Sequence, residues 1–377
     1  MEEKNMLRKC KLVLGNGFDL YCELKTKYSH YFDSKKVFFD KITELEKKFN
    51  EDIFRLNDEY EEDKLIPTIE FMHETTVWDL LFYYEPKRKE RKKWCDVEQF
   101  ILDFFNMKET TQTLFDALYD RVKKESVDFG NNKEWLTMPC AYLINNEAPT
   151  NTKIDFATYL LDELKKFESK FGKYINNEFE SKLQSKYRVK LLPFIKDVEL
   201  RWNVSSLDTF NYSPLEKAEG PGFENYYEKI YHINGDYNHP IFGIDSSKFS
   251  VKTPGYIFSK TYRRMTNDFY EGENIKTTLR NEFDDLVIFG HSLNEQDYSY
   301  YFPLFDYMDL MSITSHKGIF FYYHIDDKKN ARKIKNDNVE NLVAMLNAYE
   351  AYKTGKKNDF RLVESLSSQG RLRFRAI

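Results

Sequence analysis

The chain has 377 residues, of which 32% are charged and 41% hydrophobic, and its formal net charge is −5. This composition is typical of a folded globular protein and excludes a disordered chain. The negative charge gives no overall attraction to nucleic acid or anionic membranes, and no apolar run approaches the roughly 18 residues of a membrane span.

The cysteines predict free thiols rather than disulfides or a metal site. No Cys-x-x-Cys pair occurs among Cys10, Cys22, Cys95 and Cys140, so the sequence predicts no zinc or redox motif. The first five residues also lack the apolar stretch of a signal peptide. We therefore expect a cytoplasmic location and no metal cofactor.

The first strand-like segment, residues 10–16, leads directly into Gly15, Asn16 and Gly17. A buried strand followed by a glycine turn and a helix presents backbone N–H groups at the carboxyl edge of a parallel sheet, where α/β folds bind nucleotides. A tight turn without a ligand gives the same pattern. Asp19 falls in the first helical turn, where it either stabilises the helix dipole or binds a ribose hydroxyl.

Residues 35–200 lack clear strands and are predicted to form a mainly helical insertion. Within 155–185, apolar residues recur every three or four positions, as on the buried face of an amphipathic helix. The insertion could serve as a lid, as a partner surface or as an ordinary packed layer. Six of the seven residues from Lys87 to Lys93 are basic, which fits either contact with phosphate backbones or a solvated loop.

Four later segments, 205–212, 228–235, 284–291 and 318–325, also resemble buried strands. Several stop at polar or small residues, and such residues at the ends of parallel strands can together build a binding site. The polar residues at these ends are Thr209, Asn211, His232, Asn234, Gly290, His291 and Ser292, followed by Asp297.

The chemistry of these side chains allows a functional and a structural interpretation of each. Asn211 could hold a ribose hydroxyl or position a water, or it could form an Asx turn before Pro214. His232 could act as a general base or be a hydrogen-bonded core residue. His291 could donate to a phosphate or cap the strand, and Asp297 could orient a ribose or start the helix expected at 296–310.

Several motifs, in this order, resemble the bacterial abortive-infection H (AbiH) family of anti-phage proteins. The resemblance extends from about residue 10 to about residue 310 and begins with the Gly15–Leu20 segment and its continuation Lys25–Ser29. The later motifs are Trp94-Cys95-Asp96-Val97-Glu98, Thr209-Phe210-Asn211-Tyr212, His232-Ile233-Asn234-Gly235, Ile241-Phe242-Gly243-Ile244-Asp245 and Gly290-His291-Ser292-Leu293. The resemblance implies a role in phage defence and a phage-derived trigger as partner.

The same series is more distantly similar to the sirtuin-like NAD-binding fold, which implies a nicotinamide-ribose pocket and, in defence proteins of that fold, NAD hydrolysis. That pattern carries a histidine directly before the glycine of the His-Gly turn, whereas this chain has Asn234 there and His232 two residues earlier. Because an amide cannot accept a proton at neutral pH, any base would be His232.

Together these observations predict an α/β protein with a sirtuin-like, Rossmann-related parallel sheet. The core would comprise residues 1–34 and 201–330, the helical insertion residues 35–200, and a C-terminal helix and edge strand residues 331–377.

We expect NAD to be hydrolysed by Asn211 and His232, or only bound as a signal. A nucleic-acid effector that uses residues 87–93 is a further alternative, although nucleic acid and membrane are not the expected partners, and the oligomeric state stays open. The expected nucleotide contacts are Gly15, Asn16, Gly17, Asp19, Thr209, Asn234, Gly290, His291, Ser292 and Asp297.

Overall fold

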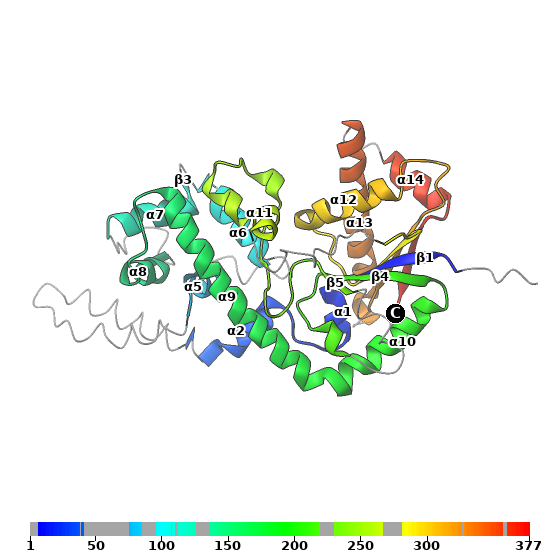
Figure 1. Cartoon of the computed structure of the whole chain (residues 1–377), viewed down its shortest axis with the longest axis horizontal. Helices are drawn as coiled ribbons and strands as arrows, with labels where there is room; N and C mark the ends of the chain where they lie inside the picture. The colour runs from blue at the N-terminus through cyan, green and yellow to red at the C-terminus, as the bar shows by residue number, and fades with distance from the viewer. Residues whose placement is uncertain are drawn as a thin grey trace, which may run out of the picture. The chain divides into compact units, whose positions relative to one another are not determined.

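The computed structural model divides the chain into two compact units, drawn together in Figure 1. The sheet unit comprises Met1–Thr26, Gly172–Pro240 and Asn267–Ile377, and the helical unit comprises Lys27–Phe171 and Ile241–Thr266. The structure describes residues 7–37, 39–40, 75–84, 96–106, 108–109, 112–125, 136–218, 230–266, 281–325, 328–356 and 360–377.

The sheet unit contains six parallel strands in the order β5-β4-β1-β6-β7-β8. Numbered by their appearance in this sheet, the strands lie in the order 3-2-1-4-5-6, which is the order of dinucleotide-binding folds. The predicted α/β class with a parallel sheet is confirmed. The strands are β1 (Lys9–Leu14), β4 (Asn203–Thr209), β5 (Ile230–His232), β6 (Asp285–Phe289), β7 (Ile319–Tyr323) and β8 (Leu372–Ala376).

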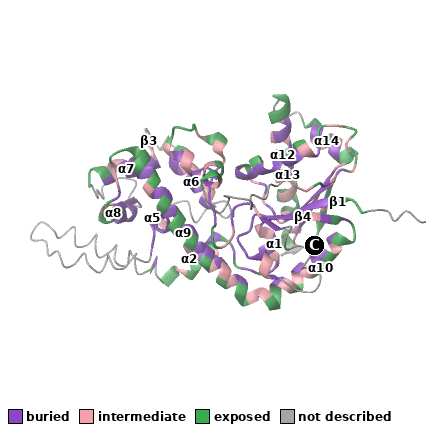
Figure 2. Cartoon of the chain, in the orientation of Figure 1, coloured by how far each residue is buried: buried purple, intermediate pink, exposed green. Residues whose placement is uncertain are grey.

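Helices cover both faces of this sheet. On one face lie α1 (Asn16–Tyr21) and α10 (Arg188–Glu199), and on the other lie α12 (Tyr298–Tyr307), α13 (Ala331–Thr354) and α14 (Arg361–Ser368). The strands β6 and β7 are mostly apolar, as expected for strands buried on both faces, whereas β1 and β4 also carry buried polar side chains, among them Lys11 and Asp208. Figure 2 shows β1 and β4 mostly in the colour of buried residues.

The helical unit is built around aromatic side chains. Its elements are α2 (Tyr28–Ser34), α5 (Val77–Tyr84), α6 (Asp96–Asn106), the hairpin of β2 (Lys108–Glu109) and β3 (Gln112–Thr113), α7 (Leu114–Lys123), α8 (Thr137–Asn145) and α11 (Lys260–Met265). Trp78 packs on Phe82 and Phe104. Aromatic residues make up 17% of the chain, and in this unit they pack against one another in the core.

The long helix α9 (Lys153–Lys182) carries the apolar stripe that the sequence indicated, and its members are buried: Phe156, Leu160, Leu164, Phe167, Phe171, Ile175 and Phe179. A π-helical turn, Leu183–Tyr187, joins α9 to α10. Residues 172–200 and 331–377 belong to the sheet unit. In the described part of the chain, no helix has the length and apolar character needed to cross a membrane.

One buried carboxylate joins the amino ends of four strands. Asp285, the first residue of β6, accepts two hydrogen bonds from the Arg8 guanidinium at 2.8 and 2.7 Å. It also accepts from the Trp202 indole N–H at 2.9 Å and from the Gly318 backbone N–H at 3.0 Å. Because these donors immediately precede β1, β4 and β7, Asp285 fixes the relative positions of these strand starts.

We predict that Asp285→Ala lowers the free energy of unfolding by about 3–5 kcal/mol, because it leaves a guanidinium and two N–H groups without their acceptor. Glu282→Ala is the control, since Glu282 is exposed and pairs only at the surface, with Lys9; its loss should cost less than about 1 kcal/mol. Urea unfolding followed by circular dichroism measures both. Equal midpoints for the two variants would contradict the clamp role of Asp285.

Candidate functional site

The loops after β1 and β6 meet at the carboxyl edge of the sheet, between the adjacent strands where the direction of chain progression reverses. The Gly15 N–H donates to the Phe289 carbonyl at 2.9 Å, and the Gly17 N–H donates to the Gly290 carbonyl at 2.7 Å. A crevice at this point is where open α/β sheets bind ligands. These two N–H groups, however, already serve the contact between the loops.

The glycines in these loops are required by backbone packing. A Cβ atom on Gly15 would lie 2.3 Å from the His291 Cα, and one on Gly17 would lie 2.7 Å from the Gly290 Cα. Gly290 itself has φ +66°, a conformation that favours glycine. The close approach inferred from the sequence therefore exists, but between two backbones, and ligand contact by these glycines stays a prediction.

Asp19 lies buried in the first turn of α1, as the sequence predicted, and is surrounded by neutral donors. Its Oδ1 accepts from the Asn211 amide at 3.0 Å, the Ser213 hydroxyl at 3.0 Å and the Tyr187 hydroxyl at 3.4 Å. Burial raises the pKa of Asp19 to about 7, although these hydrogen bonds and nearby His232 act in the opposite direction. A carboxyl group that titrates near neutral pH can hold or release a proton there.

Two amide side chains beside Asp19 have unused hydrogen-bonding capacity. Asn211 donates through Nδ2 to the Gly15 carbonyl at 3.1 Å and to Asp19, but its Oδ1 is buried without a partner among the described residues. Asn16 accepts from the Thr26 hydroxyl at 2.6 Å, and its Nδ2 is likewise buried and unpaired within the described part of the chain. Unsatisfied buried polar atoms cost stability, so a ligand that satisfies them would bind favourably.

His232, at the end of β5, lies between two hydrogen-bond acceptors. Its Nδ1 is 3.3 Å from the Asn211 carbonyl oxygen, and its Nε2 is 3.1 Å from a carboxylate oxygen of Glu216. The ring can donate to both acceptors only when it carries two protons. Burial would raise the pKa of Glu216, but the hydrogen bond and charge of His232 outweigh burial and lower it.

Three further expected residues lie around the loop after β6. The His291 Nδ1 accepts from the Leu293 N–H at 2.9 Å, and its Nε2 is 3.6 Å from Asp297. The Ser292 hydroxyl accepts from the Asn294 amide at 2.9 Å. Asp297 ends a short 3-10 turn, Glu295–Asp297, directly before α12. The contact of His291 with the Leu293 N–H fits a side chain that caps the strand end, and the position of Asp297 fits a residue that starts a helix.

The remaining expected residues lie along β4 and after β5. Thr209 is buried, and its hydroxyl accepts from the Asn211 N–H at 3.1 Å, which fixes the turn where β4 ends. Asn234 is buried in the turn after β5. The structure thus brings Gly15, Asp19, Asn211 and His232 into one chain of contacts.

Sequence reasoning missed three partners in this cluster: Tyr187, Ser213 and Glu216. Tyr187 belongs to the π-helical turn 168 residues after Asp19, so no local pattern connects the two. Glu216 lies in a 3-10 turn, Leu215–Ala218, and nothing in the sequence around it indicates that it pairs with His232 at the end of β5. Ser213 directly follows the Asn211-Tyr212 pair and could have been included on that basis.

Two of the resembling motifs lie in the helical unit, where Glu98 of the first forms an ion pair and backbone N–H groups of the second, at Phe242 and Gly243, donate to carboxylates. Glu98 pairs with Lys260 at 3.1 Å and accepts from the Gly243 N–H at 3.4 Å. Glu168 pairs with both terminal nitrogens of Arg263, at 2.5 and 2.7 Å, and also accepts from a backbone N–H. These side chains stabilise the helical unit, and the basic run 87–93 and Trp94 lie outside the described residues.

The chain matches one family model, described as "Bacteriophage abortive infection AbiH", over residues 12–316. No curated protein and no solved structure matches the chain. Within the described residues, no group of three or more His, Cys, Asp or Glu side chains is placed to hold a metal ion.

We predict that Gly15→Ala lowers the free energy of unfolding by more than about 2 kcal/mol, because the added methyl group overlaps backbone atoms that cannot rotate away. Gly355→Ala is the matched control. Gly355 has φ +72° and no atom within 4 Å of an added Cβ, so only backbone strain of about 1 kcal/mol applies there. A Gly15→Ala protein that unfolds at the wild-type urea concentration would overturn the packing explanation.

We predict that Asp19→Asn removes part of the pH dependence of stability. Because the pKa of Asp19 is about 7 in the folded state and near 4 in an unfolded chain, its protonated form stabilises the fold at low pH, and this contribution is lost as the pH rises through 7. From pH 5 to pH 8, wild type should lose on the order of 2 kcal/mol more than the variant. Urea midpoints of both proteins at each pH measure this, and parallel losses would argue against the raised pKa.

Proposed function

The chain belongs to the bacteriophage abortive infection AbiH family and so to phage defence, and from this premise we propose that it acts by hydrolysing NAD at the nicotinamide–ribose bond. The observation that carries the proposal is the unused amide oxygen of Asn211, buried at the carboxyl edge of a sheet with the strand order of dinucleotide-binding folds. The substrate's ribose would lie against Asn211, Asp19 and the loop after β6.

The reaction requires little covalent chemistry from the protein. The bond between ribose C1′ and the nicotinamide nitrogen breaks, nicotinamide leaves as a neutral molecule with the electron pair, and a positive charge develops on the ribose. A water oxygen then bonds to C1′ and releases a proton, giving nicotinamide and ADP-ribose. Positioning of the ribose and water, with electrostatic stabilisation of the positive charge, supplies most of the acceleration.

Asn211 and His232 have separate tasks in this proposal. The Asn211 Oδ1 accepts a hydrogen bond from a ribose hydroxyl or from the attacking water. His232 takes the released proton, and the resulting imidazolium gains a second hydrogen bond, since both of its neighbours are acceptors. Before this transfer, one ring nitrogen must contact water in place of its protein neighbour. We expect this at Nδ1, because its contact with the Asn211 carbonyl, at 3.3 Å, is the longer of the two.

One observation favours a second function, binding of NAD as a signal without turnover. Both ring nitrogens of His232 already face protein groups, and Asn234 stands where the sirtuin-like pattern has a histidine. In this second function the protein binds the dinucleotide while His232 keeps both of its protein neighbours, so it does not accept the proton of water. Product analysis separates this sensor role from the hydrolase role.

We predict that His232→Ala lowers the rate of NAD hydrolysis on the order of 10²–10⁴-fold, the usual contribution of a general base. His239→Ala is the matched control, because His239 lies in the same segment but is exposed and pairs with Asp236. Asn234→His should retain activity. Nicotinamide release is followed by chromatography, and NAD binding by calorimetry.

Three outcomes separate the alternatives. Full activity in His232→Ala removes His232 from the reaction. Wild-type protein that binds NAD without releasing nicotinamide supports the sensor role. Wild-type protein that neither binds nor hydrolyses NAD refutes both forms of the proposal.

A further inference from the structure

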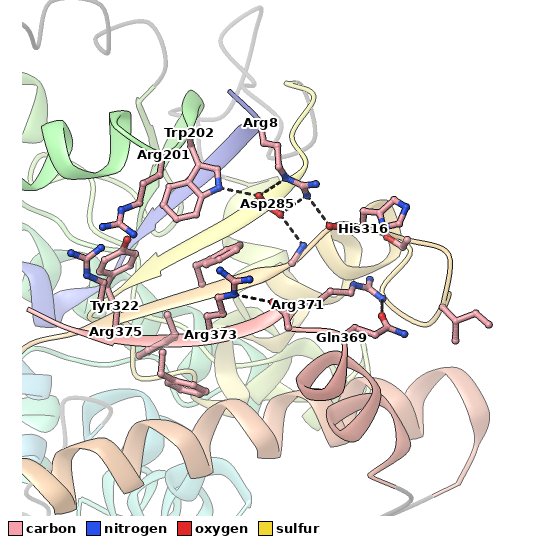
Figure 3. Close-up of a pocket in the computed structure, with 17 residues that line it drawn as sticks. Arg8, Arg201, Trp202, Asp285, His316, Tyr322, Gln369, Arg371, Arg373 and Arg375 are labelled. Atoms are coloured by element: carbon pink, nitrogen blue, oxygen red, sulfur yellow. Dashed lines mark hydrogen bonds and ion pairs between the residues drawn. The ribbon is translucent and has the colours of Figure 1, made fainter. Parts of the chain in front are cut away.

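A second candidate site lies at the starts of β1, β4 and β6 and along β7 and β8, in a pocket of about 850 Å³ (Figure 3). Its lining includes residues at or next to the strand starts, among them Arg8, Asp285 and Gly318. It also includes Phe320 and Tyr322 of β7 and Arg373 and Arg375 of the edge strand β8. The volume is that of a small-molecule site, which typically measures about 300–1,000 Å³.

The pocket is strongly basic although the protein is acidic overall. Five arginines line it, Arg8, Arg201, Arg371, Arg373 and Arg375, and Asp285 is the one lining carboxylate among the residues that the structure describes. That carboxylate already accepts hydrogen bonds from Arg8, Trp202 and Gly318. A concave surface with this excess of guanidinium groups attracts an anion, and planar guanidiniums match phosphate oxygens in a bidentate way.

Two of the five arginines are fixed by the protein itself. Arg8 is held by Asp285 and by the His316 carbonyl at 2.8 Å. Arg371 is buried and donates to the Lys317 and Ser312 carbonyls at 2.7 and 2.9 Å. These hydrogen bonds fix the two side chains in the wall of the pocket, where both contribute positive charge, and the Arg371 Nη2 is buried without a partner among the described residues.

The other three arginines are exposed and weakly engaged. Arg201 and Arg375 lie side by side at one end of the pocket, where they share the Asp197 carboxylate at 3.5 Å each (Figure 3). Arg373 contacts no carboxylate among the described residues; its Nε donates to the Gly370 carbonyl at 3.0 Å. Their guanidinium donors are therefore available to a ligand.

Aromatic rings hold two of these guanidiniums over the sheet. The Arg373 guanidinium carbon lies 5.6 Å from the Phe320 ring centre, and that of Arg375 lies 5.8 Å from the Tyr322 ring centre. The indole of Trp202 packs on Phe320 at 4.8 Å. Cation–π contacts of this kind orient arginine side chains before a ligand arrives, which lowers the entropy cost of binding.

We propose that this pocket binds a small molecule that carries a polyphosphate chain, such as a nucleoside triphosphate, through Arg201, Arg373 and Arg375. The site is separate from the carboxyl-edge cluster, because it lies at the starts of β1, β4 and β6 and that cluster lies at their ends. A small ligand fits better than a nucleic-acid strand, since the carboxylates of Glu282 and Asp284 lie beside Lys9 at this end of the strands and would repel a phosphate backbone that continues past the pocket.

The test is calorimetric titration of the full chain with ATP, with inorganic tripolyphosphate and with a single-stranded oligonucleotide too long for the pocket. The Arg373→Ala/Arg375→Ala double variant should bind ATP and tripolyphosphate at least about 10-fold more weakly than wild type, because hydrogen bonds to charged groups are lost. The matched control is Arg332→Ala/Lys333→Ala, which removes two exposed charges from α13 outside the pocket. This control should bind like wild type.

Three results would overturn the proposal: no binding of ATP or tripolyphosphate to wild type, equal weakening in the pocket and control variants, or tighter binding of the oligonucleotide than of ATP. Arg373→Gln/Arg375→Gln serves as the second pair if the alanine variant is unfolded by circular dichroism. A decline of wild-type affinity with rising salt is expected as well, since the contact is between charges.

Discussion

The contact between the loops after β1 and β6 is the constraint on which the rest of the sheet unit depends. It needs bare backbone at Gly15, Gly17 and Gly290, because any Cβ there would overlap the facing chain. Since β1 is the central strand and pairs with both β4 and β6, the contact fixes the strand ends that carry Asn211 and His291. A glycine-rich turn that resembles a phosphate loop thus has a structural task first, and any ligand must use other donors.

Two buried carboxylates at opposite ends of the sheet show how neighbours decide the role of an acid. Asp285 accepts hydrogen bonds from a guanidinium, an indole N–H and a backbone N–H, and through them it joins the strand starts. Asp19 receives hydrogen bonds only from neutral groups in the described structure, and burial then raises its pKa to about 7. An aspartate side chain therefore joins strands at one end of the sheet and titrates near neutral pH at the other, because its neighbours differ.

The sequence predicted the parts of the fold that depend on local pattern. The strand-like segments correspond to β1, β4, β5, β6 and β7, because strands buried on both faces are rich in apolar residues. The spacing of Phe156, Leu160 and Leu164 likewise predicted the buried face of α9. Asp19 was placed in the first turn of its helix because a helix follows a glycine turn in such folds.

Contacts between distant segments could not be predicted. Nothing near Asp19 points to Tyr187, and nothing near His232 points to Glu216, because each pair meets only when the fold is complete. The sequence predicted an edge strand within residues 331–377, where Arg371, Arg373 and Arg375 alternate with apolar residues. Only the structure adds Arg201 and the rings of Phe320 and Tyr322 beside them, and with them a basic pocket.

The order of strands has a consequence for synthesis. Lys11 of β1 pairs with Ser206 of β4, which lies 195 residues later in the chain. At about 5–20 residues per second, the ribosome releases β1 about 10–40 seconds before its first neighbour exists. During that interval the central strand has no sheet to join, so a chaperone that holds the first twenty residues would aid folding. A chain that terminates before β4 would leave the apolar residues Leu12 to Leu14 without the strands that cover them.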